Sequence, residues 1–230
     1  MLLLFDIDGT LLLGATDAHR DAVHAALRTV YGVADPGAAV IQPAGRTDPE
    51  IARAILVGSG VSAHGIDAGA EEFRAACVRE YARLCDDDLS RFVVPGIVEL
   101  LEALGARPDV RLSLVTGNLE PIARLKLARA GIGGHFPSGQ GGFGSDSEDR
   151  TELPAIARLR AGTAAHPHPR HRTLVIGDTP RDIACARADG VGCLAVTTGP
   201  HPAQDLRDAD AVVRNAVELR TQLERRLDTA

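Results

Sequence analysis

Short runs of hydrophobic residues, separated by longer amphipathic stretches, recur along most of the chain. The short runs have the length of buried strands, and hydrophobic positions three and four residues apart are typical of helices. The strands predicted in this way are residues 2–5, 110–115, 173–176, 191–196 and 211–213. The predicted helices of the same part of the chain are 95–104, 120–130, 180–188 and 216–227. Strands that alternate with helices predict an α/β protein with a Rossmann-like, doubly wound parallel sheet.

Residues 16–90 lack this alternation. Their hydrophobic positions follow a helical period in the segments 17–31, 47–57 and 70–84, with no convincing strand between them. Thr47 followed by Glu50 is the pattern of a capping box at the start of the second segment. We therefore expect an all-helical cap domain, residues 14–93, inserted into a catalytic core formed by residues 1–13 and 94–230.

Polar residues follow each of the three clearest strands. Asp6 and Asp8 follow the first strand, Thr116, Gly117 and Asn118 the second, and Asp178 and Asp182 the third. The carboxyl ends of parallel strands meet at one edge of a sheet, so we expect these groups to converge on one site. The alternative for Asp178 and Asp182 is that they cap the helix that follows them.

The chemistry of these groups points to phosphoryl transfer. Four carboxylates with few nearby cations repel one another, which favours a hard divalent cation with oxygen ligands, most simply Mg²⁺. A carboxylate beside Mg²⁺ can attack phosphorus, as Asp6 would, and a second acid can protonate the leaving oxygen, as Asp8 would. The Thr116 hydroxyl and the N–H groups near Gly117 and Asn118 are suited to holding phosphoryl oxygens.

The same residues resemble the motifs of the haloacid dehalogenase-like hydrolases. The DxDGT motif matches at Asp6, Asp8, Gly9 and Thr10, and the GDxxxD motif matches at Gly177, Asp178 and Asp182. This resemblance implies a Rossmann-like core, often with a helical cap inserted after the first motif. It also implies that Mg²⁺ is held by Asp6, the backbone carbonyl of Asp8, and Asp178, with Asp182 in support. The branch that the chain resembles most is the phosphoglycolate-phosphatase type.

The third motif of that family, a Lys or Arg, is the point at which the sequence departs from the pattern. Arg150 stands roughly where many members carry Lys-Pro, while Lys126 lies in the earlier helix of residues 120–130. We favour Lys126, because it is the single Lys among 25 basic side chains and an ammonium suits one crowded anion. The alternative is that Lys126 lies on a solvated helix face and Arg150 carries the role.

Composition narrows the function further. A formal net charge of −6 argues against nucleic-acid and anionic-membrane partners, and no hydrophobic run has the length of a membrane span. The four cysteines form no CxxC pair, which favours reduced, buried thiols and a cytoplasmic protein.

We therefore expect a Mg²⁺-dependent phosphomonoester hydrolase that acts on a small phosphorylated metabolite through an aspartyl-phosphate on Asp6. A phosphomutase with the same intermediate and a non-catalytic phosphate-binding regulatory domain are the two alternatives. Dehalogenation is disfavoured, because it has no use for an acid such as Asp8.

Overall fold

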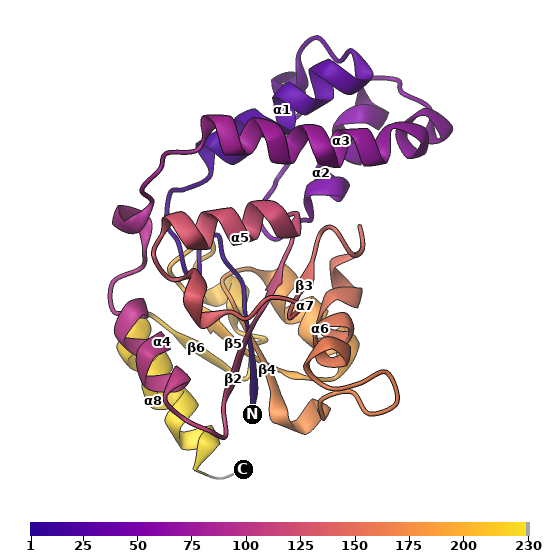
Figure 1. The fold of residues 1–230 in the computed structure, drawn as a ribbon. Helices are drawn as coiled ribbons and strands as arrows, with labels where there is room; N and C mark the ends of the chain where they lie inside the picture. The colour runs from indigo at the N-terminus through magenta and orange to yellow at the C-terminus, as the bar shows by residue number, and fades with distance from the viewer. Residues whose placement is uncertain (229–230) are drawn as a thin grey trace.

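A parallel sheet forms the centre of the molecule. The computed structural model describes residues 1–228. Within them, six parallel strands form one sheet in the order β3-β2-β1-β4-β5-β6, which confirms the predicted α/β fold (Figure 1). The strands are β1 (Leu2–Phe5), β2 (Arg111–Thr116), β3 (Gly142–Phe143), β4 (Thr173–Gly177), β5 (Gly192–Val196) and β6 (Ala211–Val213).

Helices cover both faces of this sheet. They are α4 (Ile97–Gly105), α5 (Glu120–Arg129), α6 (Leu153–Ala161), α7 (Pro180–Asp189) and α8 (Ala216–Leu227). Successive strand residues point to opposite faces, so Leu3 and Phe5 of β1 belong to the buried cluster with α4, α5 and α8. Leu2 and Leu4 belong to a second cluster with α6 and α7. Both faces of β1 are therefore buried, as its continuous hydrophobic run predicts.

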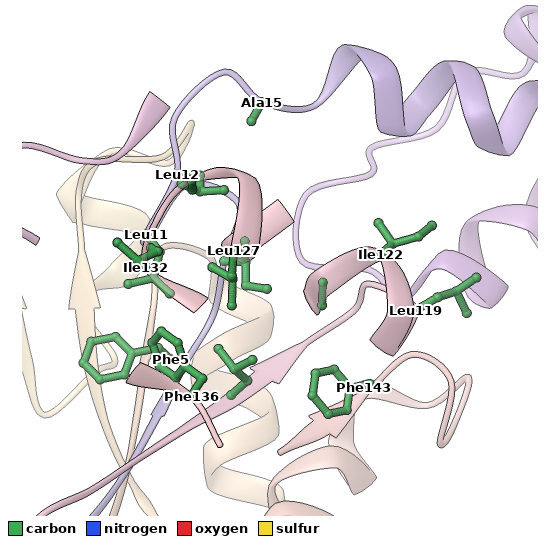
Figure 2. Close-up of a cluster of buried hydrophobic side chains, with 14 of the residues drawn as sticks. Phe5, Leu11, Leu12, Ala15, Leu119, Ile122, Leu127, Ile132, Phe136 and Phe143 are labelled. Carbon is green, nitrogen blue, oxygen red and sulfur yellow. The ribbon is translucent and has the colours of Figure 1, made fainter. Parts of the chain in front are cut away.

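A helical segment joins β1 to the rest of the sheet. It consists of α1 (Asp17–Tyr31), α2 (Asp48–Gly58) and α3 (Ala63–Leu84), which Figure 1 shows gathered beyond α5. The chain leaves and returns side by side, since the Leu13 N–H donates to the Phe92 carbonyl at 2.7 Å and the Val94 N–H to the Leu11 carbonyl at 3.0 Å. The hydrophobic cluster around Phe5 continues past Leu11, Leu12 and Ala15 into this segment (Figure 2).

Several elements differ from the sequence expectation. Helix α3 begins at Ala63, where the Ser62 hydroxyl accepts the Gly65 N–H, rather than at residue 70. Half of the expected capping box forms at α2: the Thr47 hydroxyl accepts the Glu50 N–H, but the Glu50 carboxylate pairs with Arg46.

No helix within residues 1–228 is long and apolar enough to cross a membrane.

Candidate active site

The polar residues of the three strand ends surround one cavity. Phe5 of β1 is level with Leu114 of β2 and Ile176 of β4, so the residues that follow these strands meet at one edge. The cavity has a volume of about 650 Å³ and is also lined by α1, α2 and the loop before α2. Seven of the nine predicted site residues line it: Asp6, Asp8, Thr116, Gly117, Asn118, Arg150 and Asp178. Lys126 and Asp182 lie behind this lining, each bonded to one of its residues.

Three of the four predicted acids form a compact group. One carboxylate oxygen from each of Asp6, Asp178 and Asp182 lies within 4.8 Å of the other two. Burial raises the pKa of Asp6 to about 7; Arg150 opposes the shift, and the charges of Asp182 and Asp8 add to it. Burial also raises the pKa of Asp178 to about 8, with Asp6 and Asp182 adding to the shift. The group is therefore short of positive charge where the acids meet.

Asp182 is the support of this group. Its Oδ2 accepts the backbone N–H of Thr179 at 2.9 Å and the Thr179 hydroxyl at 2.8 Å, and it completes a capping box at the start of α7. Its Oδ1 accepts a hydrogen bond from Arg150. Gly177 is required beside it, because a Cβ there would overlap the Asp182 carboxylate. Asp182 therefore does cap its helix, and the same side chain also positions Arg150.

Arg150 is the cation next to Asp6. It lies in a 3-10 turn just before α6, its side chain is 6% exposed, and it contacts Asp6 Oδ1 at 3.1 Å as well as Asp182. Burial opposes its positive charge, but Asp182 and Asp6 outweigh burial and raise the pKa of Arg150 well above its ordinary value. Arg150 therefore remains charged and is shared between two carboxylates.

Lys126 is the cation next to Asp8. Its ammonium bonds both Asp8 oxygens, at 2.8 and 2.7 Å, and the Lys126 side chain is fully buried, so it does not lie on a solvated helix face. Burial raises the pKa of Asp8, but Lys126, His19 and a hydrogen bond from Asn118 outweigh burial, and the net shift is downward. The structure therefore brings each candidate cation to a different acid of the first motif.

The loop after β2 is built around Thr116 and Asn118. The Thr116 hydroxyl accepts the Asn118 side-chain amide at 3.1 Å, and that amide also donates to Asp8 Oδ2 at 2.9 Å. The intervening residue is glycine because a Cβ at Gly117 would overlap the Arg46 carbonyl before α2. The loop is thus held on one side by Asp8 and on the other by the helical segment.

Two buried polar residues at this site were missed by the sequence analysis. His19 on α1 is 8% exposed and Asp48 on α2 is 3% exposed, and the His19 Nε2 lies 3.0 Å from Asp48 Oδ2. His19 lies three and four residues before Ala22 and Val23, which belong to the buried hydrophobic face of α1, so this spacing could have placed His19 on the same face. Asp48 had a weaker signal, because an acid in the first turn of a helix is common without any other role.

The acid group fits a divalent cation. Asp178 Oδ1 accepts the Thr10 hydroxyl at 3.1 Å, whereas Asp178 Oδ2 is buried with no hydrogen-bond partner among the described residues. A buried carboxylate oxygen without a donor is costly, and a cation relieves that cost. Both Asp182 oxygens are used by protein donors, so Asp6 and Asp178 offer the available oxygens. Oxygen donors of this kind suit a hard cation.

Comparisons with known proteins agree with this geometry. A model of the haloacid dehalogenase-like hydrolase family matches residues 3–187. The chain is 30% identical over 204 residues to a phosphoglycolate phosphatase from Rhodospirillum rubrum, with 85% of this chain and 79% of that protein covered. It is also 30% identical over 199 residues to phosphoglycolate phosphatase 1 from Pseudomonas aeruginosa, with 86% and 70% covered. A solved β-phosphoglucomutase from Clostridium difficile matches with a TM-score of 0.69 at 18% identity, covering 99% of this chain and 97% of that one.

A parallel α/β sheet with acids at the carboxyl ends of its central strands defines the class of protein as a Rossmann-like α/β protein with a carboxylate-centred site. Within that class, the chain belongs to the haloacid dehalogenase-like hydrolases. The predicted family, its phosphatase-like branch and the hydrolase class are confirmed. The likeness to the phosphoglucomutase supports the fold alone.

Proposed function

We propose that the protein is a Mg²⁺-dependent phosphomonoester hydrolase that acts on a small phosphorylated metabolite through an aspartyl-phosphate on Asp6. The observation that carries this proposal is the position of Asp6, which lines the cavity between Arg150 and the unpartnered oxygen of Asp178. With Arg150 on one side and a cation bound at the Asp178 oxygen on the other, the Asp6 carboxylate would be shielded from the negative charge of a phosphoryl group. It can therefore approach phosphorus.

In the first step, an Asp6 oxygen forms a bond to phosphorus and the bond from phosphorus to the leaving oxygen breaks. Against the effect of burial, Lys126 lowers the pKa of Asp8 in the free protein, so Asp8 takes up a proton as the negatively charged phosphoryl group binds beside it, and it gives that proton to the leaving oxygen. In the second step Asp8 takes a proton from the water that hydrolyses the aspartyl-phosphate. Thr116 and the N–H groups of the loop at Gly117 and Asn118 hold the phosphoryl oxygens. Mg²⁺, held by Asp6, the Asp8 carbonyl and Asp178 with Asp182 in support, would neutralise phosphoryl charge.

Arg150 takes the role of the third-motif cation in this proposal. Its contacts with Asp6 and Asp182 place it beside the nucleophile, whereas Lys126 contacts Asp8 and does not line the cavity. The sequence preference for Lys126 in that role is therefore replaced by a division of roles: Arg150 supports phosphoryl transfer and Lys126 supports the acid.

The helical segment, residues 14–93, is proposed to act as the cap that selects the leaving group. The paired strand contacts at Leu12 and Val93 support the boundary, and α1 and α2 supply the wall of the cavity opposite the acids. We also propose a cytoplasmic location, because all four cysteines are buried free thiols.

The test is phosphate release from an aryl phosphate, with Mg²⁺ or with EDTA, by the native protein and by Asp6→Asn. We expect release that requires Mg²⁺ and that Asp6→Asn abolishes. Asp146→Asn is a matched control, because Asp146 is a partly buried carboxylate paired with Arg160 away from the cavity. An Asp6 that becomes phosphorylated without phosphate release would favour the phosphomutase alternative. No phosphorylation at all would favour a phosphate-binding domain.

A further inference from the structure

A chain of buried polar contacts starts at Asp8 and ends in the helical segment. The Lys126 ammonium has three N–H groups; two bond the Asp8 oxygens, and the third lies 3.1 Å from His19 Nδ1. With Nδ1 as the acceptor, the Nε2–H of His19 donates to Asp48 Oδ2 at 3.0 Å. This first path links β1 and α5 of the core to α1 and α2.

A second path returns from Asp48 to Asp8. The Asp48 carboxylate accepts the Leu119 N–H at 2.8 Å, and the Asp48 N–H donates to the Gly117 carbonyl at 2.8 Å. Asn118, the residue between these two, donates its side-chain amide to Asp8 at 2.9 Å. The two paths form a closed ring of hydrogen bonds and the backbone of residues 117–119, named here the Asp8–Asp48 ring.

The members of the Asp8–Asp48 ring that hold Asp8 are buried, while Asp8 itself faces the cavity. Lys126 is 0% exposed, Asp48 is 3% exposed and His19 is 8% exposed. Tyr81 of α3 packs edge-on against the His19 ring, with 5.6 Å between ring centroids, and its ring centroid lies 6.0 Å from the Lys126 ammonium. Burying this many polar groups is weak support for stability, but it fixes geometry, because each group left unbonded would be costly.

We propose that His19 and Asp48 are positioning residues that hold the Asp8 carboxylate at the orientation needed to protonate the leaving group. His19 fixes the position of the Lys126 ammonium, which bonds both Asp8 oxygens. Asp48 fixes the loop that carries Asn118, whose side-chain amide bonds one Asp8 oxygen. The Asp8 carboxylate is therefore held in this orientation only when the helical segment contributes the side chains of His19 and Asp48. This inference rests on the proposed function, since it assigns Asp8 the role of the acid.

The experiment measures kcat/KM for a series of phosphomonoesters, from dinitrophenyl phosphate to an alkyl phosphate, in the native protein and in His19→Phe. Phe keeps the ring against Tyr81 and removes both nitrogens. Loss of acid positioning should lower kcat/KM by about 10-fold or more for the alkyl phosphate, as part of the roughly 10²–10⁴-fold that a general acid supplies. Dinitrophenyl phosphate needs no proton on its leaving oxygen and should change by less than about 2-fold.

Two further variants separate positioning from damage to the fold. Tyr31→Phe removes a polar group from the same helix, outside both the cavity and the Asp8–Asp48 ring, and should leave the dependence on leaving group unchanged. Asp48→Asn keeps an acceptor for the Leu119 N–H but removes the charge facing His19, and it should steepen that dependence as His19→Phe does. Equal losses for all substrates, or no loss, would overturn the proposal.

A measurement that needs no activity keeps this inference distinct from the proposed function. Melting temperatures of Lys126→Met, Asp48→Asn and the double variant should be non-additive, because His19 connects the two residues. Additive changes would show that the Asp8–Asp48 ring does not act as a unit and would overturn the inference. If the native protein releases no phosphate from any ester but the melting changes are non-additive, the proposed function fails, and with it the acid role, while the ring stands.

Discussion

Replacing Arg150 with Met removes a positive group that contacts both Asp6 and Asp182. The Arg150 side chain is 6% exposed, and its two carboxylate partners are 6% and 1% exposed. Asp182, which lies behind the cavity lining, cannot recover its lost hydrogen bond from bulk water. Without a metal ion, the substitution leaves buried carboxylates with no compensating cation.

The expected loss of stability follows from this burial. Removing one partner of a buried ion pair costs about 3–5 kcal/mol. In a chain of this size, that corresponds to a fall in melting temperature of roughly 6–20 °C, at about 2–4 °C per kcal/mol. Loss of one group that stabilises the transferring phosphoryl should also lower kcat by about 10²–10³-fold.

The stability difference between Arg150→Met and the native protein should grow as pH rises. The pKa values of Asp6 and Asp178 are raised to about 7 and about 8, so in EDTA their contribution to stability is full at low pH and is lost as pH rises through these values. Arg150 opposes the shift of Asp6, and the variant should raise that pKa further. Thermal unfolding in EDTA should therefore show a larger difference between Arg150→Met and the native protein at pH 8 than at pH 5.

Arg158→Met is the matched control. Arg158 is also buried and bonds both oxygens of Asp189, but it lies outside the cavity. It should lose a similar amount of stability and keep kcat at temperatures where it stays folded. A melting temperature of Arg150→Met within about 2 °C of the native value at pH 8 would contradict the expected loss of stability. Loss of aspartyl-phosphate formation in Lys126→Met but not in Arg150→Met would return the third-motif role to Lys126.

Three further predictions concern the same edge of the sheet and the core. Saturating Mg²⁺ should raise the melting temperature more at pH 8 than at pH 5, because protons on Asp6 and Asp178 compete with the cation; an equal rise at both pH values would contradict this. Gly177→Ala should lower both melting temperature and turnover, because its Cβ would overlap a buried carboxylate, whereas Gly58→Ala, whose Cβ meets no atom within 4 Å, should lower neither; activity and unfolding of the two variants provide the check. The four thiols should react with a thiol reagent only after unfolding, since burial raises the pKa of Cys185 to about 12 and the other three are also buried; fast labelling of the native protein would refute the expectation.

The elements that sequence predicted best are those with a strong local period. The helices 17–31 and 216–227 occur with the predicted bounds, because hydrophobic positions three and four residues apart repeat within each of them. Strand β3 has two residues, which is too short to show a period, and helix α6 was not delimited. These two elements depend on packing against β2, which local patterns do not record.

The candidate site also has features that the sequence determined and features that only the tertiary structure decided. The sequence by itself determined that acids and polar residues follow the three central strands, and a parallel sheet must then bring them to one edge. It did not determine which cation meets which acid, because Lys126 and Arg150 are both basic residues on segments whose approach to β1 depends on how α5 and α6 pack. Only the tertiary structure placed Arg150 at Asp6 and Lys126 at Asp8, and only it brought His19 and Asp48 to the same site. The physical reason is that strand order and side-chain period are local and repetitive, whereas an ion pair requires two particular surfaces to meet.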